Sequence, residues 1–88
     1  MSGIPEALRA RFVERCRADL ETLEGRPDQG VLHRLAHGLS GAGGTFGHPE
    51  ISGAAGRIDD VLADGGEPEP GDLDALADAL RAVIRSAG

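Results

Sequence analysis

His37 is the side chain in this sequence whose position is most suited to chemistry. If the residues around it form a helix, with about 100° between neighbours, His37 points almost opposite to the apolar side and therefore faces water. Ser40, Gly41 and Gly44 share that face, and their small size would let the backbone of another protein approach the ring. An ordinary imidazole, with a pKa of about 6.5, is largely neutral at cellular pH and offers one nitrogen as a nucleophile. The spacing predicts an accessible nucleophile on a surface that a protein partner contacts.

The helix that would position His37 carries two contradictory signals. Apolar residues recur at steps of three and four, which predicts a helix with one buried side. They are Leu32, Leu35, Leu39, Ala42 and Phe46. Glycines interrupt the pattern, and each costs about 0.8–1 kcal/mol relative to alanine, out of the ~5–15 kcal/mol that stabilises a domain. Repeated glycines inside a helix, where they lower its stability, indicate a functional surface. We assign Gly41 and Gly44 to partner access, and Gly38 and Gly43 to helix packing.

The histidines allow a second chemistry, which is metal binding. His33 and His37 are four residues apart, so both would lie on one face of a helix, with His48 close to the same line. We find no Asp or Glu on that face of the helix to complete a site. We therefore favour the interpretation without a metal, and we expect His33 and His48 to be exposed to solvent.

A longer motif surrounds His37. The segment His37-Gly38-Leu39-Ser40-Gly41, continuing to Phe46-Gly47 and Pro49-Glu50-Ile51, resembles the histidine-phosphotransfer (HPt) domain family. The motif of that family reads His, any residue, Leu, Lys and Gly, then four small or variable residues, an apolar residue and Gly. The resemblance extends to Leu35-Ala36 and to Ala54-Ala55-Gly56-Arg57-Ile58, and so covers roughly the middle half of the chain.

The resemblance implies that His37 is the phosphoryl acceptor of a two-component phosphorelay. The partner would be a response-regulator receiver domain or a hybrid histidine kinase, and the receiver would supply the phosphorylated aspartate, the Mg²⁺ ion and most catalytic groups. This chain would supply the acceptor atom and a docking surface that includes Gly41, Gly44 and His33. It would be a phosphocarrier and not an enzyme, with no cofactor of its own.

Ser40 departs from the family pattern, which usually has Lys three residues after the histidine. A hydroxyl donates only a neutral hydrogen bond, so the charge on a phosphorylated His37 needs another cation. Arg34 lies one turn earlier on the same face and is our candidate, with Arg57 a weaker one. The departure also leaves open a different class of function, a helical adaptor that binds receiver or kinase domains without being phosphorylated.

Composition limits the remaining functions. A chain of 88 residues with a formal net charge of -6 and no basic run predicts one domain, spanning 1–88, that does not bind nucleic acid or anionic lipid. The single cysteine, Cys16, excludes an internal disulfide, and its place on an apolar stripe predicts a buried thiol. We find no leader and no apolar run of about 18–20 residues, so we expect a cytoplasmic protein. We also expect it to be a monomer.

The sequence predicts an all-α fold, an antiparallel four-helix bundle with up-down-up-down order, because the apolar patterns are helical and the connections are short. The expected helices run over residues 5–24, 27–46, 49–62 and 72–84, with a loop at 64–71. Gly25 and Gly47 are expected just past helix ends, Pro49 at a helix start and Asp72 as a helix cap. The apolar stripes of the other three helices are Ile4, Leu8, Phe12, Cys16, Leu20 and Leu23; Ile51, Ala54, Ala55, Ile58, Val61 and Leu62; and Leu73, Leu76, Leu80, Val83 and Ile84.

Overall fold

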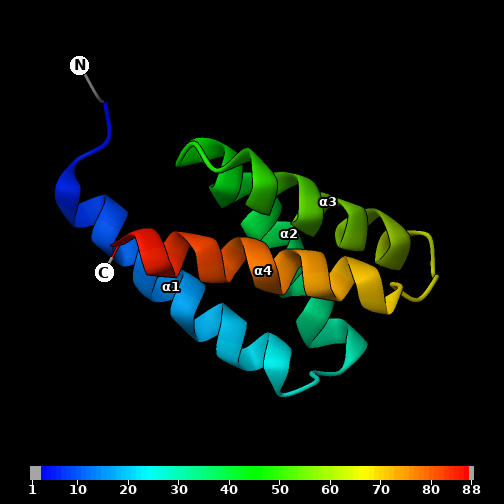
Figure 1. The fold of residues 1–88 in the computed structure, drawn as a ribbon. Helices are drawn as coiled ribbons and strands as arrows, with labels where there is room; N and C mark the ends of the chain where they lie inside the picture. The colour runs from blue at the N-terminus through cyan, green and yellow to red at the C-terminus, as the bar shows by residue number, and fades with distance from the viewer. Residues whose placement is uncertain (1–2, 88) are drawn as a thin grey trace.

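The computed structural model describes residues 3–87, and these form four α-helices and no strand. The helices are α1 (Glu6–Glu24), α2 (Gln29–Thr45), α3 (Pro49–Ala63) and α4 (Pro70–Ala87). They pack side by side into an elongated bundle with extents of 41 × 22 × 19 Å (Figure 1). The predicted all-α class is confirmed, and each expected helix is found close to its expected bounds.

The helices do not share their contacts equally. α2 packs most extensively against α3, and α4 packs against both α1 and α3, whereas α1 and α2 touch at few points. Figure 1 accordingly shows α4 between α1 and α3, with the N-terminal end of α1 and the C-terminal end of α4 at the same end of the bundle. The α2–α3 pair, which contains the motif around His37, is therefore the most closely packed part of the fold.

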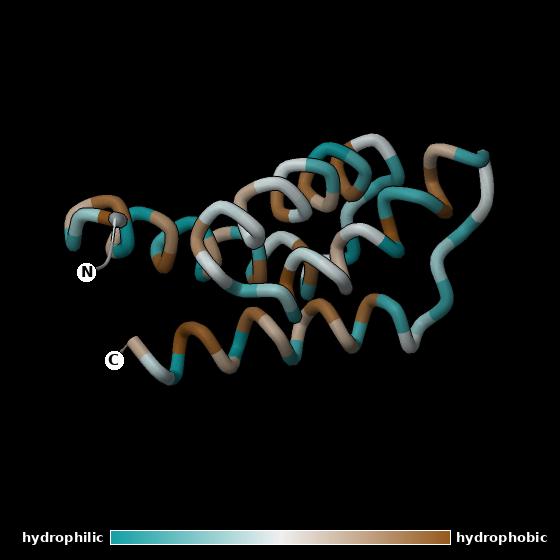
Figure 2. Tube along the Cα trace, turned by 90° about the horizontal axis from the view of Figure 1, so that it is seen from above, coloured by the Kyte–Doolittle hydropathy of each residue, from teal (hydrophilic) through white to brown (hydrophobic). Residues whose placement is uncertain are grey.

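The core forms where the apolar sides of the four helices meet. Figure 2 shows hydrophobic segments recurring along the helices between hydrophilic ones, the pattern that buries one side of each helix. The buried apolar residues are Phe12, Cys16, Leu23, Leu32, Leu35, Ala36, Leu39, Ile51, Ala54, Ala55, Ile58, Leu76, Ala77 and Leu80. Cys16 is fully buried, as predicted, while Ala36 and Ala77 join the core beyond the predicted stripes.

Leu8 is a member of the predicted α1 stripe that lies outside the core. Its exposed fraction is 44%. The first turn of α1 lies beyond the C-terminal end of α4 in Figure 1. The prediction for Leu8 was wrong because the apolar pattern continues past the part of α1 that its neighbour covers.

α2 begins two residues later than expected. Its first residue is Gln29, because the side chain of Asp28 accepts a hydrogen bond from the backbone N–H of Val31 at 2.9 Å and so caps the helix. α3 begins at Pro49 as predicted, since proline lacks the N–H that a first helical residue leaves unpaired.

α4 begins two residues earlier than expected, at Pro70. Asp72, which was predicted to cap the start of the helix, therefore lies inside the first turn. Its carboxylate accepts a hydrogen bond from the backbone N–H of Glu69 at 3.3 Å. The side chain still pairs an N–H group at the start of the helix, but it reaches back from within the helix to do so.

The ends of α1 and α2 differ in where the chain turns. Gly47 has a φ of +78°, the left-handed conformation expected of the glycine that stops α2. Gly25 keeps a near-helical φ of -78° because its N–H still bonds back to Glu21, and the left-handed residue is Arg26, with a φ of 56°. Gly25 thus ends α1 without adopting the left-handed conformation for which a glycine was expected there.

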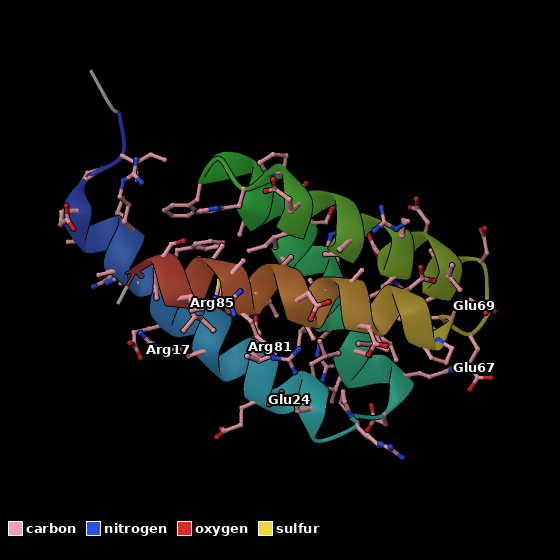
Figure 3. The ribbon with its side chains drawn as sticks, viewed as in Figure 1. Arg17, Glu24, Glu67, Glu69, Arg81 and Arg85 are labelled. Atoms are coloured by element: carbon pink, nitrogen blue, oxygen red, sulfur yellow. The ribbon has the colours of Figure 1, made fainter. Side chains whose placement is uncertain are left out.

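The bundle is also joined at its periphery by ion pairs. Arg81 on α4 donates to Glu24 at the end of α1 at 2.6 Å and to Asp78 on its own helix at 3.1 Å (Figure 3). Among residues 3–87, no helix is both long and apolar enough to span a bilayer.

Candidate functional site

The seam between α2 and α3 brings three titratable side chains together. Nδ1 of His37 lies 3.1 Å from Oδ2 of Asp59, and Nε2 of His33 lies 2.8 Å from Oδ1 of the same carboxylate. The two histidines come from successive turns of α2, and Asp59 comes from α3. One carboxylate thus bridges two imidazole rings.

His37 is exposed, as its position opposite the apolar stripe predicts. Its side chain is 78% exposed, and its ring contributes to a shallow hollow lined by His33, Arg34, His37, Asp59 and Ala63. An ionised carboxylate only accepts hydrogen bonds, so Nδ1 of His37 carries a hydrogen, and Nε2 of the neutral ring then keeps its lone pair. Within the described part of the chain, Nε2 has no hydrogen-bond partner. The arrangement holds the ring by one nitrogen and leaves the other open as a nucleophile.

Asp59 is ionised under ordinary conditions. The hydrogen bond from His37 holds the pKa of the Asp59 carboxyl below its usual value, with a further contribution from His33, while burial acts in the opposite direction. The side chain is 19% exposed, so its negative charge lies partly shielded from water beside the His37 ring.

Asp59 was not among the predicted site residues, because it lies on a different helix from the histidines and helical periodicity relates only residues of one helix. Residues equally distant along the chain from His48 face each other across the seam. Asp59 meets His37 in this way, as Ser40 meets Gly56 and Gly44 meets Ser52. Counting outward from the predicted His48-Pro49 corner would therefore have identified Asp59 as the carboxylate opposite His37.

The other two histidines differ from expectation. His33 is half-buried, with 42% of its side chain exposed, and its Nε2 is occupied by Asp59. His48 is half-buried as well, because its ring stacks on Phe12 with 5.3 Å between ring centroids, and Phe12 in turn stacks on Phe46 at 4.7 Å. Both rings are therefore less exposed than predicted, and His48 does not join the site. Residues 3–87 contain no group of three or more His, Cys, Asp or Glu side chains arranged to hold a metal ion.

The two candidate cations lie in different places. Arg34 is exposed and lines the same hollow as His37, with its guanidinium directed back along α2 toward Gly30. Arg57 extends toward α4 instead, where its Nε is 4.0 Å from Oδ1 of Asp72. Of the two, Arg34 is the one that shares a surface with His37.

Ser40 faces the seam more than the solvent. Its hydroxyl oxygen lies 3.5 Å from the position that a Cβ would take at Gly56, and its backbone carbonyl accepts a hydrogen bond from the Ser52 hydroxyl at 2.7 Å. Ser40 therefore contributes to the α2–α3 junction beside His37.

The four glycines between residues 38 and 44 of α2 differ in what surrounds them. A Cβ at Gly41 would meet nothing within 4 Å, and one at Gly44 would touch only the Ser52 hydroxyl at 3.8 Å, so both leave open surface beside His37. A Cβ at Gly38 would overlap the Arg15 guanidinium, and one at Gly43 would lie against α3. Gly43 thus serves packing, as predicted, whereas the neighbour of Gly38 is the end of a long, partly exposed side chain.

Comparison with known protein families gives a match. Residues 7–86 match the family model described as the Hpt domain. No curated protein and no solved structure gives a significant match to the chain. The match covers all but the ends of the chain, including His37 and Asp59. The chain belongs to the Hpt domain family, which implies histidine phosphotransfer in two-component phosphorelays.

Proposed function

We propose that His37 is the phosphoryl acceptor of this Hpt domain. It takes the group from a phospho-aspartyl receiver or a kinase and passes it to a receiver aspartate. The observation that carries this proposal is the exposed His37 ring, whose Nδ1 is held by Asp59 at 3.1 Å while Nε2 is open. A nucleophile oriented in this way needs only an in-line phosphorus atom to react.

The transfer step is the attack of His37 Nε2 on the phosphorus of an aspartyl phosphate. The P–N bond forms as the P–O bond to the aspartate breaks, and the aspartate leaves as a carboxylate. The imidazole ring gains positive charge because Nδ1 keeps its hydrogen while Nε2 gives up its lone pair. Asp59 next to Nδ1 stabilises that charge, and the same contact serves the reverse transfer to the next receiver.

The residues around His37 have supporting roles in this proposal. Arg34, on the rim of the same hollow, offsets the charge of the bound phosphoryl group. Ser40 lies one turn after His37, at the seam between α2 and α3. Gly41, Gly44 and His33 belong to the surface on which the receiver docks. The receiver brings the Mg²⁺ ion and most catalytic groups, so the chain acts as a carrier without a cofactor of its own and not as an enzyme.

The proposal extends to the organisation of the chain. The chain works as a single domain over residues 1–88, with its helices in up-down-up-down order, as a monomer in the cytoplasm. Its partners are response-regulator receivers, hybrid histidine kinases or both. The acidic balance of -6 supports partners that are proteins and disfavours nucleic acid.

A second function is favoured by one observation, the Ser40 that replaces the usual lysine of the family. A chain that kept the helical bundle but lost the ability to be phosphorylated would bind receiver or kinase domains as an adaptor. The open Nε2 of His37 and its carboxylate partner support the phosphocarrier over this adaptor.

The test is to incubate the purified chain with receiver domains carrying radioactive phosphoryl groups. The expected product is an acid-labile, base-stable label on this chain, which is lost in His37→Gln and kept in His48→Gln. Label that survives His37→Gln would overturn the assignment of the acceptor. A chain that binds receivers without becoming labelled would be the adaptor.

A further inference from the structure

We propose that His33 is a positioning residue for phosphoryl transfer, because it holds Asp59 in the orientation that keeps Nδ1 of His37 protonated. The inference rests on the proposed function of His37 as acceptor. It gives a role in the transfer reaction to a second histidine that neither receives nor contacts the phosphoryl group.

The geometry of Asp59 is the basis of this inference. Oδ1 is 2.8 Å from Nε2 of His33, and Oδ2 is 3.1 Å from Nδ1 of His37. The contact with His33 is the shorter of the two, and His33 is the less exposed ring, at 42% against 78% for His37. The carboxylate is therefore anchored on the His33 side, and its second oxygen is directed to His37.

The orientation of Asp59 matters because a neutral imidazole exists in two tautomers. Only the tautomer with hydrogen on Nδ1 leaves Nε2 free to attack phosphorus. A carboxylate fixed beside Nδ1 selects that tautomer, in the way that an outer partner fixes the ring of a functional histidine. A carboxylate free to rotate toward solvent would let part of the His37 population carry its hydrogen on Nε2, where it blocks the reaction.

The surroundings of Asp59 leave this anchoring role to His33. The remaining residues of the hollow are Arg34 and Ala63. The side chain of Ala63 has no polar atom, and the guanidinium of Arg34 is directed toward Gly30. Within residues 3–87, His33 is thus the polar side chain besides His37 that lies within hydrogen-bond distance of the Asp59 carboxylate.

The test compares variants at His33 that differ in side-chain length and in whether the side chain carries an N–H donor. His33→Gln keeps an N–H at nearly the distance of Nε2, whereas His33→Asn is too short and His33→Leu has no donor. We expect His33→Leu and His33→Asn to accept phosphoryl groups about tenfold more slowly in single turnover, and His33→Gln to match the unaltered protein. Nitrogen NMR of His37 should report hydrogen on Nδ1 in the unaltered protein and in His33→Gln, and both tautomers in the other two variants.

His48→Gln is the matched control, because it alters a half-buried histidine that does not contact Asp59. It should leave the tautomer of His37 and the transfer rate unchanged. If His33→Leu does not fold, the comparison of His33→Gln with His33→Asn decides the question alone. An unchanged rate and a single Nδ1 tautomer in His33→Asn would overturn the inference.

Failure of the inference is distinct from failure of the proposed function. His37→Gln is measured in the same assay. Label retained in His37→Gln contradicts the function of His37 as acceptor. Label lost in His37→Gln, together with a normal rate and tautomer in the His33 variants, contradicts only the role of His33.

Discussion

Gly43 on α2 lies so close to Ser52 on α3 that a Cβ at position 43 would be 2.8 Å from the Ser52 backbone nitrogen. The same atom would be 3.1 Å from Cγ2 of Ile51 and 3.2 Å from the carbonyl oxygen of His48. Two of these neighbours are backbone atoms, which cannot rotate away. The missing side chain therefore allows the close approach of the two helices that carry His37 and Asp59.

Gly43→Ala is expected to destabilise the fold. The added methyl group requires the α2–α3 backbones to separate, and overpacking of this kind typically costs about 1–3 kcal/mol. That cost exceeds the gain of about 0.8–1 kcal/mol that alanine brings to a helix interior. Urea unfolding measures the change. Gly41→Ala is the control, since open space surrounds Gly41 and the substitution should stabilise the protein; a Gly43→Ala protein as stable as Gly41→Ala would contradict the packing argument.

A large side chain at Gly41 is expected to impair the encounter with the receiver without harming the fold. Gly41→Leu adds its side chain into open space beside His37, so the helix is retained while the surface approached by a partner is obstructed. We expect about tenfold weaker binding of a receiver domain, equivalent to about 1.4 kcal/mol, by titration calorimetry. Gly53→Leu places the same bulk on an exposed glycine of α3 next to Arg57 and should leave binding unchanged. Equal affinities for the two variants would remove Gly41 from the docking surface.

Asp59→Asn is expected to slow phosphoryl acceptance by about 10–100-fold, the range typical for loss of a group that orients a functional histidine. An amide lacks the negative charge that stabilises the ring during attack, and its NH₂ group can donate to Nδ1 and so favour the unreactive tautomer. Rapid-quench measurement of label transferred from a phosphorylated receiver gives the rate.

Asp60→Asn is the matched control for this substitution, because Asp60 is the adjacent carboxylate on α3 and is exposed. Both variants remove one negative charge, so a general effect of charge on the encounter would slow or accelerate them alike. A specific loss in Asp59→Asn supports the contact with His37. Similar rates for the two variants would show that Asp59 does not orient the acceptor.

Cys16 is expected to make the fold less stable in alkaline solution. Burial raises the pKa of the Cys16 thiol to about 11, with a smaller contribution from Asp19 and an opposing one from Arg15. The unfolded thiol ionises near its ordinary pKa of about 8.5, while the folded thiol stays protonated. The unfolded state therefore binds fewer protons between those values, and the free energy of unfolding contributed by this group falls as pH rises from about 8.5 to 11.

Unfolding in urea at about pH 8 and about pH 10, below and above the ordinary thiol pKa, measures this effect. Cys16→Ala lacks the thiol, so it should lose less stability over the same interval. In the folded protein, Cys16 should also resist alkylation at neutral pH, because the thiolate is the reactive form and the side chain is fully buried. Rapid alkylation without denaturant would contradict the burial.

The amino-acid sequence by itself determined the features that depend on neighbours along the chain. The apolar stripe of α2 and the left-handed Gly47 follow from helical period and from the conformational freedom of glycine. The exposure of His37 follows because a residue opposite a buried stripe must face outward. The division between open Gly41 and packed Gly43 follows from the same helical geometry.

Only the tertiary structure decided which side chains from different helices meet. The pairing of Asp59 with both His33 and His37 depends on the register of α3 against α2, and that register depends on the close approach at Gly43. The stacking of His48 on Phe12 likewise joins side chains from separate helices. Helical periodicity fixes the direction of a side chain about its own axis, but contacts between helices are fixed by how their surfaces fit together, and a one-turn slip of α3 would replace Asp59 with another residue.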